Sequence, residues 1–169
     1  SIGIFAIELS GGALSSSAKM GTKQWDEARL MNPNTVVIEL FTLEDTNFRE
    51  LINVFHRSVH AIPDIIYSAE QKSAWAPDCV DSSVWKMRLE QNQTWVARDE
   101  KNRECLGFIE LNPKGDIECL YVCPRAQRHG IAKNLVVTAS EYMHSRYPDK
   151  QQWYVDASDI AYEFFLKLG

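Results

Sequence analysis

The sequence predicts one α/β domain built round a mixed sheet, and three observations lead to this expectation. A β-branched run at 35–41 is followed by apolar residues at helical spacing. Short strand patterns separated by turn residues then occupy the middle of the chain. A last strand pattern at 117–122 leads through a tight loop into a long helical pattern. With 169 residues, of which 45% are hydrophobic, the chain is long enough for one core and short for two.

Residues 1–30 differ in composition from the remainder, so we expect an N-terminal extension over 1–30 and the domain proper over 31–169. Residues 11–17 read Gly-Gly-Ala-Leu-Ser-Ser-Ser, which is typical of a flexible linker, and 22–30 have the pattern of a short helix. The alternative is that this stretch supplies a genuine additional strand and helix. The apolar start lacks a preceding basic region, which argues against a signal peptide.

The elements of the domain follow from local patterns. A strand is expected over 35–41 and a helix over 42–60, with a cap region at Thr42. Ser68 and Gln71 have the spacing of a capping box, so a second helix should begin there and end before Pro77. The remaining expected elements are a helix at 81–91, strands at 94–98, 105–111 and 117–122, a helix at 131–147 stopped by Pro148, a strand at 153–155 and a helix at 160–168.

Composition excludes several classes of partner. The net charge of -5 and pI of about 5.4 argue against nucleic acid as a general partner. No run approaches the roughly 20 apolar residues of a membrane span. The four cysteines do not form a close-spaced framework, which favours reduced thiols in a cytoplasmic protein.

The segment 120–135 carries the main functional signal, because a strand runs into a short loop and then into a helix that opens at Gly130. The first N–H groups of a helix have no partner within it, so such a loop binds anions, most commonly phosphate. Gly130 lacks a Cβ and lets a diphosphate approach the backbone, and Arg125 and Arg128 add positive charge. The chain has neither the P-loop nor the Rossmann glycine pattern.

This segment resembles the acyl-CoA signature of the GNAT superfamily of N-acetyltransferases. The signature, Gln/Arg-x-x-Gly-x-Gly/Ala after a strand ending Leu-x-Val-x-Pro, stands here as residues 120–124 and 127–132. The order of elements from residue 35 onwards is also the GNAT order. Tyr67-Ser68-x-x-Gln71 and Ala74-Trp75-Ala76-Pro77, with Gly107-Phe108, are similar to the YafP-like branch of small bacterial acetyltransferases.

One departure from the family concerns the end of the chain. The sequence stops at Gly169, where the family usually continues with Gly-Phe and one or two further strands. The resemblance therefore implies a GNAT fold that lacks its usual C-terminal strands and leaves an exposed strand edge. Either a second chain covers this edge, which favours a homodimer, or residues 2–8 fold across it.

The resemblance implies acetyl-CoA as co-substrate. It places the pantetheine arm on Leu120, Tyr121 and Val122, with the Val122 N–H polarising the thioester carbonyl. The pyrophosphate is expected on backbone N–H groups from Arg128 to Ala132. The complete expected set of cofactor-binding residues is Leu120, Tyr121, Val122, Gln127, Arg128, His129, Gly130, Ile131 and Ala132.

An amine acceptor must lose a proton, so a general base is needed. Glu118 on the central strand is the first candidate, Glu110 the second and Asp156 the third; the alternative for each is an ordinary carboxylate on a solvated sheet face. The family often places a tyrosine acid in the last helix, but Phe165 stands at that position here. Tyr162, three residues earlier, is the weaker candidate, and solvent is the alternative proton donor.

For the acceptor site we expect His60, Tyr67, Trp75 and Glu110, although Tyr67 and Trp75 could equally pack the helices against the sheet. No metal is expected. His56 and His60 have the spacing of a helical metal pair, but Arg57 occupies the position where a zincin has glutamate. Cys119 and Cys123 lie four residues apart along a strand, which is the wrong geometry for one tetrahedral ion.

Together these features predict an N-acetyltransferase that moves an acetyl group from acetyl-CoA directly to a primary amine of a small molecule or peptide. The alternative is a catalytically inactive CoA-binding or protein-interaction module on the same scaffold. A third reading, an unrelated α/β domain with a matching loop, would have to explain the loop and the Ala-Trp-Ala-Pro element by coincidence.

Overall fold

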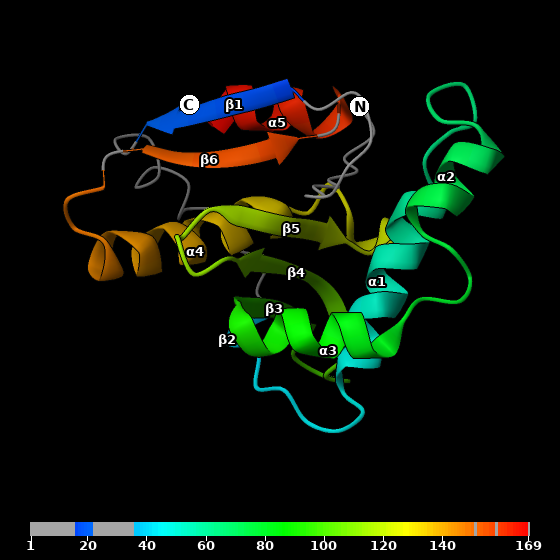
Figure 1. Cartoon of the computed structure of the whole chain (residues 1–169), viewed down its shortest axis with the longest axis horizontal. Helices are drawn as coiled ribbons and strands as arrows, with labels where there is room; N and C mark the ends of the chain where they lie inside the picture. Colours follow the sequence, from blue (N-terminus) through cyan, green and yellow to red (C-terminus); the bar gives the residue numbers. More distant parts are fainter. Residues whose placement is uncertain (1–15, 22–35, 151, 158, 169) are drawn as a thin grey trace.

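The described part of the chain is organised by a six-stranded sheet in the order β1-β6-β5-β4-β3-β2 (Figure 1). The computed structural model describes residues 16–21, 36–150, 152–157 and 159–168. The strands are β1 (Ser16–Gly21), β2 (Val36–Leu40), β3 (Gln93–Asp99), β4 (Cys105–Leu111), β5 (Ile117–Val122) and β6 (Gln152–Ala157). The helices are α1 (Phe48–His60), α2 (Ala69–Trp75), α3 (Ser82–Gln91), α4 (Ile131–Arg146) and α5 (Asp159–Leu168), with a short 3-10 turn at Pro124–Ala126.

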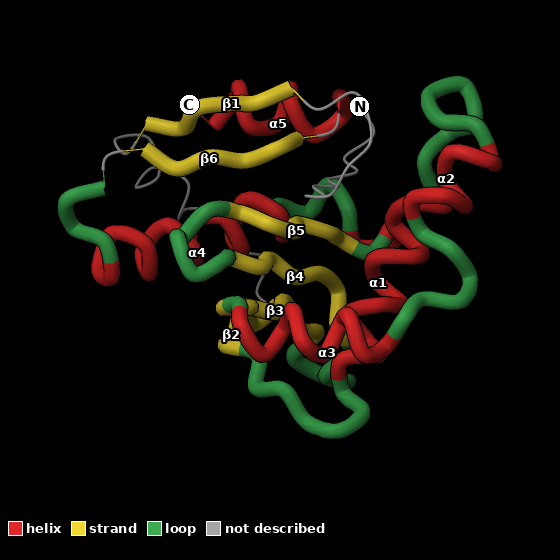
Figure 2. Tube along the Cα trace, in the orientation of Figure 1, coloured by secondary structure: helices red, strands yellow, loops and turns green. Residues whose placement is uncertain are grey.

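Strands β2 to β5 lie side by side (Figure 2) and form an antiparallel meander, whereas β6 runs parallel to β5, as the arrows in Figure 1 show. The parallel pair needs a crossover, and α4 supplies it. The mixed α/β fold class expected from the sequence is therefore confirmed. None of the described helices is both long and apolar enough to cross a lipid bilayer.

Alternate residues of the strands divide the core into two halves, one on each face of the sheet. On one face, Leu120 and Val122 pack with α4 residues such as Leu135 and with Phe165 of α5. On the other face, Tyr121 and Phe108 pack with Phe55 of α1 and Trp85 of α3. The sheet thus lies between two layers of helix, and successive residues of β5 contribute to opposite layers.

Two expected helix starts had different outcomes. The capping box at α2 is confirmed, because Ser68 Oγ accepts from the Gln71 N–H and Gln71 Oε1 accepts from the Ser68 N–H. The start of α1 at Thr42 is wrong. Asn47 closes a turn instead, accepting from the Glu44 N–H and donating to the Thr42 carbonyl, so the helix begins only at Phe48.

Strand β1 corresponds to the alternative that we considered for residues 1–30, a genuine additional strand, although its first residues lie in the stretch with linker composition. Ser16–Gly21 pairs antiparallel with β6, from Ser16 opposite Ala157 to Gly21 opposite Gln152. The edge of β6 that we expected to be open is therefore covered by β1, and the homodimer prediction loses the open edge on which it rested. The other segments to which we assigned roles, residues 2–8, the helix at 22–30 and the boundary at residue 31, lie outside the described residues.

Candidate active site

The end of β5 presents backbone groups away from β4. The Cys123 N–H donates to the Leu106 carbonyl of β4, so in the antiparallel pattern the N–H groups of Val122 and Leu120 point to the opposite side, towards β6. Pairing between β5 and β6 is described only at Ile117 and Val155, near the start of β5. The Val122 N–H thus lies five residues beyond the last described pair between β5 and β6, at Ile117.

The Val122 carbonyl, by contrast, is engaged within the protein. Ser58 Oγ lies 2.9 Å from this oxygen and 2.6 Å from the Val54 carbonyl, so its one hydroxyl hydrogen is shared between two acceptors. Gln127 Nε2 donates to the Val122 oxygen over 3.0 Å. Gln127, expected at the cofactor, therefore directs its side-chain amide to the backbone of β5. Its role in the described structure is to hold the loop against the strand.

The loop between β5 and α4 has an unusual backbone. Arg128 has φ of +66° and Gly130 has φ of +78°, both in the left-handed region that glycine adopts most readily. Gly130 is the N-cap residue of α4, and no side chain caps the helix. The first intrahelical bond runs from the Asn134 N–H to the Gly130 carbonyl, so the N–H groups of 131–133 have no partner inside the helix.

This helix start fits a diphosphate. The first turn of α4 contains no acidic residue, and the helix dipole adds partial positive charge. The side chains of Ile131 and Ala132 are buried, so only their backbone N–H groups face a ligand at the loop. Arg128 and His129 are exposed, and His129 Nδ1 lies 2.7 Å from the Gln127 carbonyl, a contact that closes the loop on itself.

Arg125, which we expected to add positive charge beside the diphosphate, is paired with a carboxylate of the protein instead. Its guanidinium forms an ion pair with Glu104, at the start of β4, and this contact raises the pKa of Arg125. Arg125 also lines a cavity of about 250 Å³, together with Ala126, His129 and Ile131. Of the two arginines expected beside the loop, Arg128 is the one without a described ion pair.

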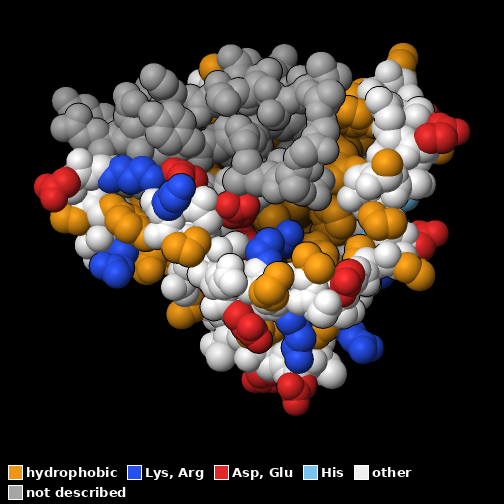
Figure 3. Space-filling view, viewed as in Figure 1, with side chains coloured by type: hydrophobic (Ala, Val, Ile, Leu, Met, Phe, Trp, Pro, Cys, Tyr) orange, Lys and Arg blue, Asp and Glu red, His pale blue; other side chains and the backbone are white. Residues whose placement is uncertain are grey.

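A cavity of about 290 Å³ lies on the opposite side of β5, between the sheet and the helices α1 to α3. Its lining includes four aromatic side chains, for which we call it the aromatic cavity, and Tyr121 and Cys119 of β5 line it from the sheet. Figure 3 shows hydrophobic side chains gathered where this face is hollowed. The lining residues from the helices and their connections include Phe55, Trp75, Val80, Trp85 and Arg88.

Arg88 is the basic residue among the lining residues of this cavity, beside the acidic Asp81, and was not expected from the sequence. Its guanidinium stacks on Trp85, 4.2 Å from the ring centroid, and its Nε lies 2.9 Å from Glu110 Oε1. Burial acts to lower the pKa of Arg88, but the facing Cys119 and Glu110 outweigh it, and the net direction is upward. Arg88 is therefore held as a cation at the wall of an aromatic cavity.

Glu110, expected as an acceptor-binding residue and second candidate base, is fully buried beneath this arginine. Asn92 Nδ2 donates to Glu110 Oε1 over 2.6 Å. Glu110 does not line the cavity, and its carboxylate is paired with Arg88. The structure thus places it in a buried ion pair behind the cavity wall.

Glu118 lies at an irregularity of β5, where Glu110 pairs with Cys119 but Leu111 pairs with Ile117. Such a bulge inserts an extra residue and redirects its side chain. The half-buried Glu118 carboxylate accepts from Asn112 Nδ2 at 2.9 Å. Asp156 belongs to β6 and Tyr162 to α5, but their side chains are not among those described.

Of the remaining residues expected at the acceptor site, Trp75 and Tyr67 contact each other at the cavity, whereas His60 does not face it. Trp75 lines it, and its ring contacts Tyr67 edge-on at 5.6 Å. The buried Trp75 Nε1 has no hydrogen-bond partner in the described part of the chain. His60 is directed elsewhere, since its Nε2 lies 2.7 Å from the Ala76 carbonyl in the connection after α2.

Residues 64–169 match the family described as the acetyltransferase (GNAT) domain. The chain is 33% identical over 136 residues to the uncharacterised N-acetyltransferase YafP of Escherichia coli, covering 78% of this chain and 80% of that protein. Strand, loop and helix therefore define an acyltransferase, and the chain belongs to the GNAT family of acetyltransferases. This confirms the resemblance seen in the sequence.

Solved structures agree with this assignment. The GCN5-related N-acetyltransferase of Rhodopseudomonas palustris superposes with a TM-score of 0.72 at 27% identity, covering 82% of this chain and 83% of that one. The PaiA N-acetyltransferase of Thermoplasma acidophilum, solved in complex with coenzyme A, has the same fold at 20% identity and a TM-score of 0.57, with 79% and 89% covered. Neither comparison favours an inactive module.

Proposed function

We propose that the protein transfers an acetyl group from acetyl-CoA to a primary amine of a small molecule or peptide, without a covalent enzyme intermediate. The observation that carries this proposal is the continuity of two features. The Val122 N–H points to the side of β5 away from β4, and only eight residues later α4 begins with uncapped N–H groups at Gly130. A long ligand with a carbonyl at one end and a diphosphate further along would match both.

In this proposal the backbone N–H groups of Arg128 to Ala132 bind the pyrophosphate, and Leu120 to Val122 hold the pantetheine arm. Acetyl-CoA supplies an activated acyl group as a thioester. The Val122 N–H donates to the acyl carbonyl oxygen and stabilises negative charge that develops there. Its position is fixed by the bonds that Ser58 and Gln127 make to the carbonyl of the same residue.

The aromatic cavity is the proposed acceptor site, because Tyr121 lines it from the sheet and belongs to the same strand segment as Val122. Trp75 and Arg88 offer buried donors at its wall. An acceptor with an apolar portion and an oxygen that accepts hydrogen bonds suits this lining. Glu118 is the proposed base, acting on the amine directly or through water, and Tyr162 or solvent protonates the leaving thiolate.

Thermal unfolding with and without acetyl-CoA tests the cofactor assignment first. At about 100 times its dissociation constant a ligand adds about 2.7 kcal/mol, which for a chain of this size raises the midpoint by about 5–10 °C. ATP and NAD serve as controls, because they also carry phosphates but no thioester arm. A rise with acetyl-CoA alone supports the proposal, after which release of free thiol in the presence of candidate amines identifies the acceptor. An unchanged midpoint overturns the cofactor assignment.

A further inference from the structure

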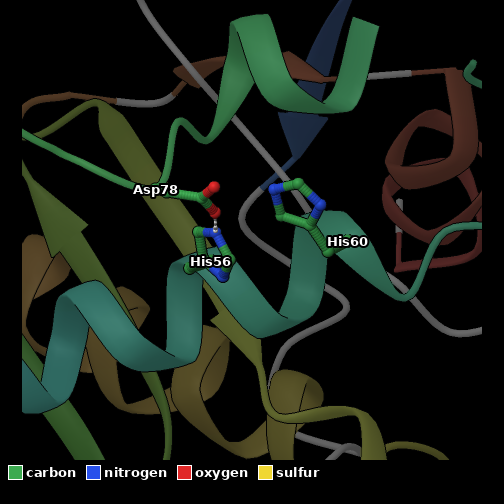
Figure 4. Close-up of side chains that lie close together, drawn as sticks. All are labelled: His56, His60 and Asp78. Carbon is green, nitrogen blue, oxygen red and sulfur yellow. Dashed lines mark hydrogen bonds and ion pairs between the residues drawn. The ribbon is translucent and has the colours of Figure 1, made fainter. Parts of the chain in front are cut away.

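His56, His60 and Asp78 lie close together between α1 and the connection that follows α2 (Figure 4). The histidines lie one helical turn apart on α1, and Asp78 belongs to the connection between α2 and α3. The two imidazole rings stack with their centroids 4.2 Å apart. One possible ligand atom from each residue lies within 4.8 Å of the other two.

Hydrogen bonds already turn both rings towards this connection. His56 Nε2 lies 3.0 Å from Asp78 Oδ1, and His60 Nε2 lies 2.7 Å from the Ala76 carbonyl. A carbonyl only accepts, so His60 donates from Nε2 in this arrangement. The Asp78 side chain is 91% exposed and that of His56 33% exposed, which leaves the cluster open to solvent on one side.

We propose that His56, His60 and Asp78 form a binding site for a divalent transition-metal ion, with Zn²⁺ the ion best suited to the three groups. Imidazole nitrogen and carboxylate oxygen bind Zn²⁺ at about 2.0–2.2 Å, and the ligand atoms of a tetrahedral site lie about 3.3 Å apart. Closing the cluster round an ion thus requires side-chain movements on the order of 1 Å, judged by the same bond lengths. Water supplies the fourth ligand from the exposed side.

Ion binding competes with the hydrogen bonds seen here. An imidazole ligates through a nitrogen without hydrogen, so His60 must either bind through Nδ1 or move its hydrogen from Nε2 to Nδ1. Binding therefore weakens the contacts of the two rings to Asp78 and Ala76. Asp78 stays next to His56 as a fellow ligand. The site is therefore expected to bind reversibly, with an affinity that each of the three side chains affects.

The cluster lies next to the aromatic cavity, so an ion bound there would affect the cavity wall. Residues on both sides of Asp78 line that cavity, among them Pro77 and Cys79. An ion that joins Asp78 to α1 fastens this wall to the helix that carries Phe55. The ion thus acts on the shape of the aromatic cavity and takes no part at the reacting atoms. This inference does not depend on the identity of the acyl donor.

Calorimetric titration of the metal-free full chain with ZnCl₂ tests the site, carried out in a Cys79→Ser background. Cys79 is an exposed thiol adjacent to Asp78, and removing it excludes zinc binding through sulfur. The expected result is one Zn²⁺ per chain and a higher unfolding midpoint. Co²⁺ at the same stoichiometry provides a visible absorption band that reports low coordination number.

Three variants remove one ligand each: His56→Ala, His60→Ala and Asp78→Asn. Each is expected to lower zinc affinity more than about tenfold, because even partners outside the coordination sphere carry 10–100-fold effects. His144→Ala, which removes an exposed imidazole of α4, should leave the affinity unchanged. Asp78 is exposed, so Asp78→Asn keeps the test decisive if a histidine variant fails to fold. No binding, unchanged affinity in Asp78→Asn, or binding only when Cys79 is present overturns the site.

Discussion

Ser58 of α1 places its Oγ 2.9 Å from the carbonyl oxygen of Val122, 64 residues further along the chain. Gln127 reaches the same oxygen from the loop. One backbone carbonyl thereby ties together a helix, the central strand and the loop before α4. The N–H of the same residue, which points to the same edge of β5 as the carbonyl, is the proposed donor to the acyl carbonyl, so these contacts fix the donor's direction.

Ser58→Ala is expected to make the orientation of the Val122 N–H less well fixed. Loss of one buried hydrogen bond costs about 1 kcal/mol, which lowers the unfolding midpoint by about 2–4 °C. The KM for acetyl-CoA should rise, because the Val122 carbonyl keeps only Gln127. Steady-state kinetics measure the effect, with Ser145→Ala at the exposed end of α4 as the matched control. Equal KM values in both variants would contradict this role.

Substitution of Gly130 separates backbone strain from charge. A side chain at φ of +78° costs roughly 1–2 kcal/mol for most residues, but asparagine tolerates this region well. Gly130→Glu adds a negative charge at the proposed diphosphate site and should abolish CoA binding, whereas Gly130→Asn should retain the fold and weaker binding. Calorimetry with CoA compares the two. If Gly130→Glu binds CoA as tightly as Gly130→Asn does, the diphosphate lies elsewhere.

Glu118→Gln tests the base. The variant retains an oxygen for the bond from Asn112 but cannot take a proton, so the turnover number should fall by about 10²–10⁴-fold. Affinity for CoA should not change. The pH dependence of kcat/KM should lose its acid limb, since this limb reports the base. Glu90→Gln, an exposed carboxylate of α3, is the control, and a wild-type pH profile in Glu118→Gln would remove Glu118 from the mechanism.

Local patterns were sufficient for most of the fold. The capping box of α2 and the alternating strand residues depend on neighbours in sequence, so a single sequence contains the information needed to place them. Strand β1 could be stated only as an alternative, because its serines and glycine carry no strand pattern and its place depends on pairing with β6. The start of α1 was misplaced because Asn47 competes for backbone groups that a helix would otherwise use.

In the site, too, features that depend on sequence neighbours could be predicted and features that depend on tertiary contacts could not. The loop at Gly130 is visible in the sequence because its chemistry depends on consecutive residues. The pairing of Arg88 with Glu110 spans 22 residues, and only the packing of α3 over β4 brings them together. Asp78 likewise meets His56 only through tertiary structure. A possible signal for Arg88 was its spacing of three from Trp85, which puts both on one helix face.

The buried pair of Arg88 and Glu110 predicts an asymmetric mutational response. Arg88→Met leaves a fully buried carboxylate with Asn92 as its described partner and should cost about 3–5 kcal/mol in the free energy of unfolding. Adding Glu110→Gln removes the uncompensated charge and should recover most of this loss. Urea unfolding provides the values. Lys86→Met, on the same helix beside the exposed Asp45, should cost at most about 1 kcal/mol. A double variant no more stable than Arg88→Met would show that the charge is not what makes the single change costly.

The contact of Glu39 with Arg103 predicts a dependence of stability on pH. The hydrogen bond from Arg103 Nη2, at 2.6 Å, and a second from Arg98 Nε lower the pKa of Glu39 below its usual 4.5. The folded chain therefore holds this proton less tightly than the unfolded chain. The stabilisation is complete above the unfolded pKa and is lost as the pH falls through the folded one.

Arg103→Met should reduce the free energy of unfolding at about pH 7, by at most about 1 kcal/mol because Glu39 is partly exposed. The difference from the wild type should shrink towards zero as the pH falls through the lowered pKa of Glu39, below which the carboxylate is protonated in both proteins. Urea unfolding across this range measures it, with Lys114→Met as a surface control. A difference that stays constant with pH would mean that Arg103 stabilises the fold through packing of its side chain and not through the charge of Glu39.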